Sequence, residues 1–318
     1  MSAESQEFRV IPRVTDCWFL TGPTASGKTR LGVELARRLD AEIVSLDSMA
    51  VYRDMNIGTA KPTLQERCGI VHHMIDVVDP ADEFSLAAYV TLASSAVEAI
   101  HARGKRVLFV GGTPLYLKGM IRGIFDGPGS DPLFRTEIEK RCQLDGTNTL
   151  HQELERIDPE TALRLHPNDK RRIIRALEVF EKTGKPISFF QKQFDCPASR
   201  DEVRVFVLDW NRELLYDRIN QRVDIMLNDG FLDEVKQLLT RPRSLGKTAS
   251  QAVGYRELIA YLREEMSFDD AIDRTKQLSR NFAKSQGTWF RSLSECEYVS
   301  VGPDTDWNAL ADTLAAIG

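Results

Sequence analysis

A glycine-bracketed loop follows the first strongly apolar run of the chain. Residues 22–29 are Gly-Pro-Thr-Ala-Ser-Gly-Lys-Thr, a complete G-x-x-x-x-G-K-[ST] phosphate-binding loop (P-loop), and Cys17–Leu20 stands directly before it. An amphipathic stretch from Arg30 to Leu39 comes next. This order predicts a buried strand, a tight turn and a helix whose N-terminal amides face a bound anion. The motif favours an α/β fold with a phosphorylated ligand, but it does not say which phosphate is held.

Alternation of apolar runs with helical patterns extends this prediction to a whole domain. Runs typical of strands occupy Cys17–Leu20, Ala41–Leu46 and Arg106–Val110, and Ser85–Arg103 has helical periodicity with Ser85 as its N-cap. Such alternation predicts a doubly wound parallel sheet with helices on both faces. After Arg212 the chain is expected to be mainly helical.

A mainly helical insertion is expected within this sheet domain. Beyond a turn-rich stretch at Phe125–Pro132, about 65 residues lack a strand pattern, and the next strand pattern is Val203–Leu208. We therefore predict a discontinuous core of residues 1–125 and 200–318 and a helical insertion domain of residues 126–199. The alternative is one domain with long loops. Arg164 to Lys192 holds eight basic and three acidic residues, a footprint suited to a polyanion.

Composition and local sequence patterns exclude several other classes of protein. The 318 residues are 42% hydrophobic, which supports a sizeable core. No apolar run approaches the roughly 18–20 residues needed to span a bilayer, and the start of the chain lacks a signal-peptide pattern, so we expect a cytoplasmic protein with no membrane partner. Five scattered cysteines form no C-x-x-C pair, and His72-His73 has no further ligand at usable spacing, so no disulfide framework or zinc site is expected.

Two of the expected strands are followed by residues that could take part in catalysis or ligand binding. Asp47 follows the second strand at the edge where parallel sheets bind ligands, as a general base, a metal-shell ligand or the cap of the next turn. The third strand ends in Gly111-Gly112-Thr113, without the acidic residue that usually holds Mg²⁺ in nucleotide hydrolases. This indicates a phosphorylated compound that is not hydrolysed as ATP, unless the glycines merely make a turn.

Two further segments carry basic side chains. Arg218 and Arg222 lie four residues apart on an expected helix, and they suit either a lid over phosphate oxygens or a solvated face. Ser279 to Arg291 mixes basic and aromatic residues, which suits nucleic acid, although Trp289 and Phe290 are the kind of residues that also fill cores.

Taken together, these blocks resemble the tRNA dimethylallyltransferase family over nearly the whole chain, in its bacterial form. Besides the P-loop, the resemblance is carried by Ser45–Ser48, Tyr52–Pro62, Val110–Thr113, His166–Asp169, Arg175–Val179, Val253–Arg256 and Thr288–Arg291. It implies an enzyme that transfers a dimethylallyl group from dimethylallyl diphosphate to N6 of adenosine 37, next to the anticodon of tRNA, and releases diphosphate. The expected partners are the tRNA anticodon stem-loop and dimethylallyl diphosphate, and the protein is expected to be a monomer.

The resemblance also implies roles for individual residues. Asp47 would take the proton of N6, Arg222 would neutralise charge on the leaving group with Arg218 in reserve, and Thr113 would line the channel. Mg²⁺ is the expected cofactor, held at Thr29. The donor diphosphate would be bound by Gly22, Thr24, Ala25, Ser26, Gly27, Lys28 and Thr29.

For the tRNA, the implied contacts form a longer set. They are Asp47, Ser48, Met49, Ala50, Thr113, Arg135, Arg171, Arg172, Ile173, Ile174, Arg175, Gln251, Gly254, Tyr255, Arg256, Lys284, Gln286, Trp289 and Arg291. Gln251, Ser285 and Gly287 depart from the family pattern, which bears on the strength of contacts and not on the chemistry. Two other functions remain open from the residues alone: a P-loop small-molecule kinase using ATP, and a non-catalytic RNA-binding regulator that depends on a nucleotide.

Overall fold

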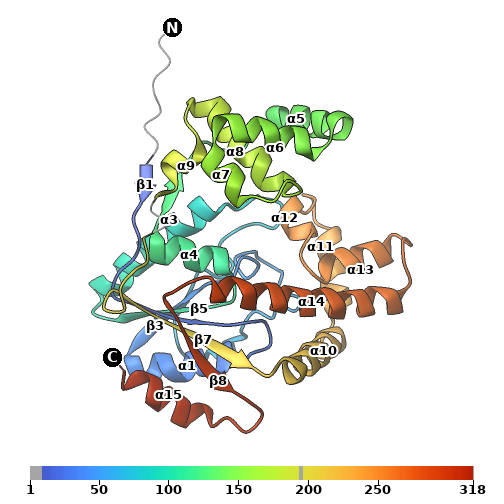
Figure 1. The fold of residues 1–318 in the computed structure, drawn as a ribbon. Coiled ribbons are helices and arrows are strands. Elements are labelled where there is room, and N and C mark those ends of the chain that lie inside the picture. The colour runs from blue at the N-terminus through green and yellow to red at the C-terminus, as the bar shows by residue number, and fades with distance from the viewer. Residues whose placement is uncertain (1–8, 193–195, 318) are drawn as a thin grey trace. The chain divides into compact units, whose positions relative to one another are not determined.

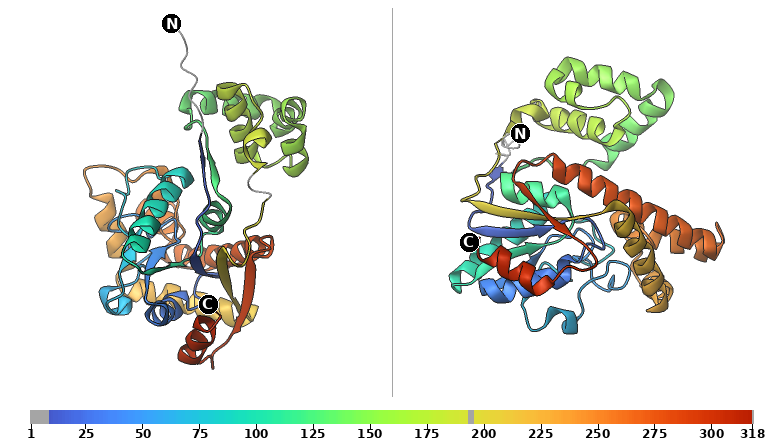
Figure 2. Two further views of the ribbon diagram at one scale, coloured as in Figure 1. Left: turned by 90° about the vertical axis from the view of Figure 1, so that its left-hand side faces the viewer. Right: turned by 60° about the horizontal axis from the view of Figure 1, so that its bottom comes forward.

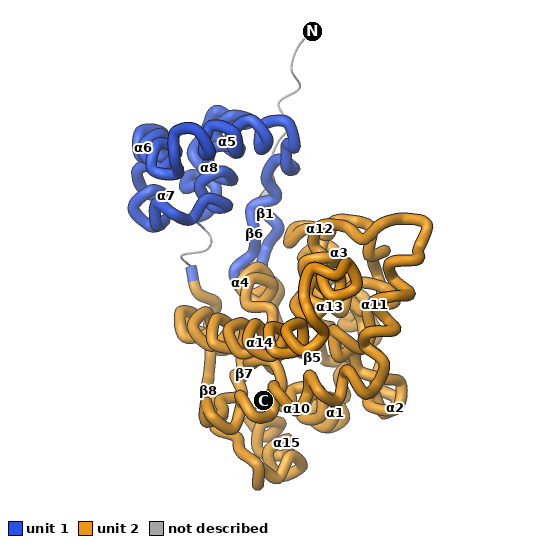
Figure 3. The backbone as a smooth tube through the Cα atoms, turned by 90° about the vertical axis from the view of Figure 1, so that its right-hand side faces the viewer, with its two compact units in different colours: residues 1–13, 122–196 blue, residues 14–121, 197–318 orange. Residues whose placement is uncertain are grey.

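The chain divides into two compact units in the computed structural model, which describes residues 9–192 and 196–317. Unit 1 consists of residues 1–13 and 122–196, and unit 2 of residues 14–121 and 197–318 (Figure 3). The division differs from the expected boundaries chiefly near the N-terminus. There, β1 (Arg9–Ile11) pairs antiparallel with β6 (Ile124–Asp126), which joins the start of the chain to the helical unit.

Unit 2 is built on a six-stranded parallel sheet. Its strand order is β4-β3-β5-β2-β7-β8, with β2 (Cys17–Thr21), β3 (Ala41–Ser45), β4 (His72–His73), β5 (Arg106–Val110), β7 (Val203–Trp210) and β8 (Cys296–Val301). Every residue of β2 and β3 is buried, as expected for strands covered on both faces. The doubly wound α/β prediction is confirmed. The mainly helical expectation after Arg212 missed β8, which pairs in parallel with β7 at the edge of the sheet.

Helices cover both faces of this sheet (Figures 1 and 2). On one face lie α1 (Lys28–Leu39) and α15 (Trp307–Ala315), and on the other α3 (Leu86–Ala102), α4 (Pro114–Arg122) and α14 (Phe268–Arg291). The expected helix after Ser85 is confirmed, because the Ser85 side chain accepts a hydrogen bond from the amide of Ala88. The rest of unit 2 holds α2 (Leu64–Arg67), α10 (Arg212–Asn228), α11 (Phe231–Leu239), α12 (Lys247–Ser250) and α13 (Tyr255–Leu262).

Unit 1 packs its helices around a core of its own. They are α5 (Pro132–Asp145), α6 (Thr147–Ile157), α7 (Pro159–Arg164), α8 (Lys170–Thr183) and α9 (Ile187–Phe190). Helix α8 begins after the capping side chain of Asp169 and ends at Gly184, whose φ of 66° is a conformation that favours glycine. In the described parts of both units, no helix is long and apolar enough to cross a bilayer.

Candidate active site

Three turns of unit 2 meet at one edge of the sheet. The P-loop follows β2, Asp47 follows β3 and Gly111-Gly112-Thr113 follows β5. Because β3, β5 and β2 are parallel and adjacent in that order, their carboxyl ends all open at the same edge. The chain thus brings together the segments that the sequence singled out.

The P-loop has the backbone expected of an anion-binding turn. Gly27 is the N-cap of α1 with a φ of 92°, a left-handed conformation that glycine adopts without strain. Lys28 Nζ donates to the carbonyl oxygens of Gly22 at 3.0 Å and Pro23 at 2.6 Å. Burial and the positive charge of Arg222 lower the pKa of Lys28 to about 7, while Asp47 opposes the shift. The loop is therefore short of negative charge, which a bound anion would supply.

Asp47 caps the turn that it begins. Its Oδ1 accepts hydrogen bonds from the amides of Met49 at 2.8 Å and Ala50 at 3.2 Å, so the capping role that the sequence left open is present. Within the described part of the chain, Oδ2 receives no hydrogen bond. One oxygen therefore orients the carboxylate and the other is available for a ligand.

Thr113 lies beside the same turn. Its Oγ1 accepts a hydrogen bond from the Ser48 amide at 3.0 Å, and its own amide donates to the Leu46 carbonyl at 3.1 Å. The glycines before it allow this approach, since a Cβ on Gly111 would lie 2.2 Å from the Leu46 carbonyl oxygen. The turns after β3 and β5 are therefore packed backbone to backbone.

The two arginines of α10 have different surroundings. Arg218 Nε donates to the Ala25 carbonyl of the P-loop at 2.9 Å, and its guanidinium lies 4.4 Å from the centre of the Trp210 ring. Burial lowers the pKa of Arg222, while Asp47 and Glu66 oppose that shift. Among the described residues Arg222 has no hydrogen-bonding or ion-pair partner, so its positive charge is available to a bound anion.

On α14, the expected tRNA contacts divide into buried and exposed residues. Gln286 is buried, and its amide links the P-loop to Gly112. Lys284 and Arg291 are exposed and Trp289 is half-buried. The exposed basic residues suit a polyanion, whereas Gln286 is committed to the interior.

The contacts expected from α12 and α13 divide in the same way. Gln251 is exposed, and Arg256 is partly exposed with its Nε bonded to Glu257 Oε1 at 2.7 Å. Gly254 is buried, and the buried Tyr255 hydroxyl donates to Glu234 Oε1 at 2.6 Å. Tyr255 thus supports the fold around Glu234.

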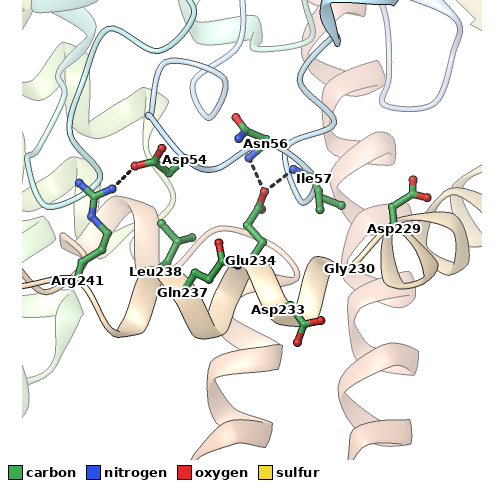
Figure 4. A pocket seen from close by; sticks show the side chains of 10 residues that line it. All are labelled: Asp54, Asn56, Ile57, Asp229, Gly230, Asp233, Glu234, Gln237, Leu238 and Arg241. Atoms are coloured by element: carbon green, nitrogen blue, oxygen red, sulfur yellow. Dashed lines mark hydrogen bonds and ion pairs between the residues drawn. The ribbon is translucent and has the colours of Figure 1, made fainter.

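Glu234 stabilises the backbone of the Tyr52–Pro62 segment. Its carboxylate accepts hydrogen bonds from the amides of Asn56 at 2.8 Å, Ile57 at 2.7 Å and Gly58 at 3.2 Å. Figure 4 shows the side chain reaching from α11 to this loop beside a surface pocket. The buried Lys61 also stabilises this segment, because its Nζ donates to the Tyr52 carbonyl at 2.7 Å and to Asn56 Oδ1 at 2.9 Å. The segment is therefore a braced loop continuous with the Asp47 turn.

Unit 1 carries the remaining expected contacts. Arg171 and Arg172 are exposed, but Ile173 and Ile174 are buried in the core of the unit and so serve its packing. Arg135 and Arg175 donate to the fully buried Glu178, at 2.8 Å and 2.7 Å to its Oε2.

Glu178 is charged despite its burial. Burial alone would raise the pKa of Glu178, but hydrogen bonds from Arg135, the Asp131 amide and Arg175 outweigh it and lower the pKa to about 2. Arg135 and Arg175 are thus held rigidly, and each keeps part of its side chain exposed.

For the expected Mg²⁺, the protein offers few ligands of its own. Thr29 lies in the first turn of α1 as the motif requires, and its hydroxyl is a hard oxygen donor. Nowhere in the described ranges do three or more His, Cys, Asp or Glu residues gather as a metal site. This set fits a Mg²⁺ ion that takes most of its ligands from a bound diphosphate and water, as Mg²⁺ commonly does.

Comparison with known proteins decides the family. The IPP transferase family model matches residues 50–293. The chain belongs to this family. A tRNA dimethylallyltransferase of Caldanaerobacter subterraneus is 45% identical over 299 residues, which cover 93% of this chain and 95% of that protein. The resemblance inferred from the sequence is confirmed.

Solved structures agree with this assignment. The tRNA isopentenylpyrophosphate transferase of Bacillus halodurans matches with a TM-score of 0.69 and 38% identity, covering 95% of this chain and 96% of that one. A eukaryotic dimethylallyltransferase captured acting on tRNA matches with a TM-score of 0.79 and 30% identity, covering 94% of this chain and 77% of that one. The P-loop fold and the prenyltransferase class are therefore shown for this chain.

Sequence reasoning missed residues that act through long-range contacts. The role of Gln286 between two turns, the bracing by Glu234 and the buried charge of Glu178 each depend on partners remote in the chain. Only Glu178 had a local signal, since it lies three residues after Arg175 on an expected helix.

Proposed function

We propose that this edge of unit 2 is where a dimethylallyl group passes from dimethylallyl diphosphate to N6 of adenosine 37, next to the anticodon of a tRNA. The family supports the overall reaction, transfer of a dimethylallyl group to tRNA. One observation carries the placement: the turns bearing Asp47 and Thr113 pack beside a P-loop whose neighbouring strand β5 ends in glycines instead of an acidic residue.

The P-loop binds the donor diphosphate in this proposal. Amides of residues 25–29, the N-terminus of α1 and Lys28 surround the anion, while the Thr24 amide is bonded to Gln286. Thr29 would hold Mg²⁺ together with the diphosphate, and the ion, when bound, would supply positive charge to the leaving group. Arg222, which is half-buried and has no partner among the described residues, adds a second cation, and Arg218 supports the loop through Ala25.

Asp47 acts on the nucleophile. Adenine N6 attacks the first carbon of the allyl group, the carbon–oxygen bond to diphosphate breaks, and the proton of N6 passes to Asp47 Oδ2. An exocyclic adenine amine is a poor nucleophile, so loss of the proton as the bond forms avoids a strongly acidic intermediate. The hydrogen bonds to Oδ1 keep the carboxylate oriented for this step. Thr113 lines the channel in which donor and adenine meet.

The tRNA is bound by exposed basic side chains of both units. Arg171 and Arg172 of unit 1, with the exposed parts of Arg135 and Arg175, bind the phosphates of the anticodon stem-loop. Gln251, Arg256, Lys284, Trp289 and Arg291 of unit 2 contact the loop, and adenosine 37 leaves its stack to reach Asp47. We further propose that the protein works as a cytoplasmic monomer.

Label transfer tests this function against its alternatives. The protein is incubated with Mg²⁺, labelled dimethylallyl diphosphate and unmodified tRNA, and separately with ATP and candidate metabolites. We expect label in tRNA, none in a tRNA whose adenosine 37 is replaced by guanosine, and no consumption of ATP. ATP consumption without labelling would identify a kinase, and RNA binding without either reaction would identify a regulator.

A further inference from the structure

The side chain of Gln286 connects two turns at the candidate active-site edge of the sheet by hydrogen bonds. Its side chain is almost fully buried, with 3% of the residue exposed. The amide oxygen accepts a hydrogen bond from the Thr24 amide at 2.9 Å, and the amide nitrogen donates to the Gly112 carbonyl at 2.5 Å. A single side chain from α14 thus uses its acceptor on the P-loop and its donor on the turn after β5.

The backbone of Gly112 is packed tightly between the P-loop and Gln286. A Cβ on Gly112 would lie 2.6 Å from Gln286 Nε2, 3.1 Å from the Gly22 carbonyl oxygen and 3.6 Å from Lys28 Nζ. Movement of Gly112 would therefore be transmitted to the P-loop backbone and to its lysine. Gly112 also precedes Thr113, which is bonded to the Asp47 turn through Ser48. Gln286 consequently sits where the diphosphate half and the nucleophile half of the site are joined.

The position of Gln286 on α14 does not suit direct contact with RNA. Lys284 and Arg291 lie two residues before it and five after it, which places them on roughly the opposite side of a helix. Both are exposed where Gln286 is buried. The helix therefore directs Gln286 to the sheet edge and its basic residues elsewhere.

We propose that Gln286 is a positioning residue of the transfer reaction, fixing the separation between the diphosphate-binding loop and the Thr113 turn. The proposal rests on the assignment of the P-loop to the donor diphosphate. Transfer requires the leaving oxygen, the allylic carbon and the attacking nitrogen to be aligned, and a misplacement of about 1 Å is enough to cost on the order of 10² in rate. One amide with a donor and an acceptor holds both sides of that alignment.

Two substitutions separate the parts of this role. Gln286→Met keeps a similar length and an apolar stem but removes both hydrogen bonds. Gln286→Glu keeps an acceptor for the Thr24 amide, loses the donor to Gly112 and sets a negative charge beside a carbonyl oxygen. Gln277→Met is the matched control, because Gln277 is an exposed glutamine on the same helix. All three are compared with the wild type as full chains.

The measurements are donor KM, kcat, the Kd of inorganic diphosphate with Mg²⁺, the Kd of tRNA, and Tm. We expect both Gln286 variants to lose about 10- to 100-fold in kcat/KM for the donor, with weaker diphosphate binding in Gln286→Glu. Their tRNA Kd should stay within about threefold, and Gln277→Met should match the wild type. Tighter diphosphate binding by Gln286→Met than by Gln286→Glu would further show that the added negative charge weakens binding.

Two results would overturn the positioning role. A change in tRNA Kd with unaltered donor kcat and KM would make Gln286 a direct tRNA contact. A lower Tm with normal kinetics below that temperature would make it a packing residue only. If the wild type itself bound no diphosphate, the donor assignment would fail first, and that result is distinguishable because it does not involve the variants.

Discussion

The buried ammonium of Lys28 should make diphosphate binding depend on proton uptake above neutral pH. Burial, followed by the charge of Arg222, lowers the pKa of Lys28 from 10.5 to about 7. A bound diphosphate brings negative charge to this ammonium and returns its pKa toward the ordinary range. The ligand therefore binds the protonated form, and a proton is taken up wherever Lys28 is neutral before binding.

The size of this effect follows from the pKa. Lys28 is about half protonated at pH 7, about one tenth at pH 8 and about one hundredth at pH 9. The Kd of diphosphate should therefore rise about fivefold from pH 7 to 8 and about ninefold from pH 8 to 9, where a tenfold change is about 1.4 kcal/mol. Lys28→Arg keeps its charge throughout this range, so the ratio of the two Kd values removes the titration of the ligand itself.

Calorimetry measures both quantities. Titration with diphosphate at pH 8, in two buffers of different ionisation enthalpy, should show about 0.9 more protons taken up by the wild type than by Lys28→Arg. Parallel pH profiles for the two proteins would refute the reasoning. Without ligand, the same shift has a defined sign for folding: between pH 7 and 10.5 the unfolded chain binds the extra proton, so this group makes the protein more stable as pH rises.

Three further predictions concern single features. Asp47→Asn retains an acceptor for the turn amides, so Tm should be unchanged and tRNA affinity should stay within about tenfold, while turnover falls about 10²- to 10⁴-fold; a wild-type rate would remove Asp47 as the base. Arg171→Ala with Arg172→Ala should weaken tRNA binding and flatten its dependence on log salt by about one to two units, and an unchanged slope would contradict the proposed contact. Glu178→Gln should cost about 1–3 kcal/mol of stability in denaturant unfolding, because it weakens the hydrogen bonds from two arginines that stay partly exposed. Because the pKa of Glu178 is lowered to about 2, its contribution should persist at pH 5 and be lost as pH falls from about 4.5 toward 2.

Local patterns predicted the elements that carry the site. The P-loop, the strands before Asp47 and Gly111, and the helix capped by Ser85 are each determined by residues close in the chain. Apolar runs of five residues are enough for buried parallel strands. The edge strand β8 was missed because Glu297 and Ser300 interrupt its apolar residues, so no continuous apolar run marks it, and only Val301 is fully buried.

Contacts between distant segments could not be predicted in the same way. Ile173 and Ile174 share a basic stretch with Arg171 and Arg172, yet helical geometry turns them into the core of unit 1. Gln286 stands among basic and aromatic residues that suit nucleic acid, yet it bonds to backbone groups more than 170 residues away. Residue type therefore predicts the chemistry of a segment, while the fold decides which members of that segment face the ligand.

The glycines after β5 connect the packing of the edge to its chemistry. An aspartate at position 111, where a nucleotide hydrolase would hold its metal ligand, would drive its Cβ to within 2.2 Å of the Leu46 carbonyl oxygen. The turn after β3 would then have to move, and Asp47 with it. Close packing of these two turns therefore excludes an acidic residue at that point and leaves Asp47 as the carboxylate placed beside the P-loop at the end of β3. A single carboxylate oriented by two backbone amides is suited to accepting one proton, and the cations of the site are left to bind the phosphate, as the proposed expulsion of an intact diphosphate requires.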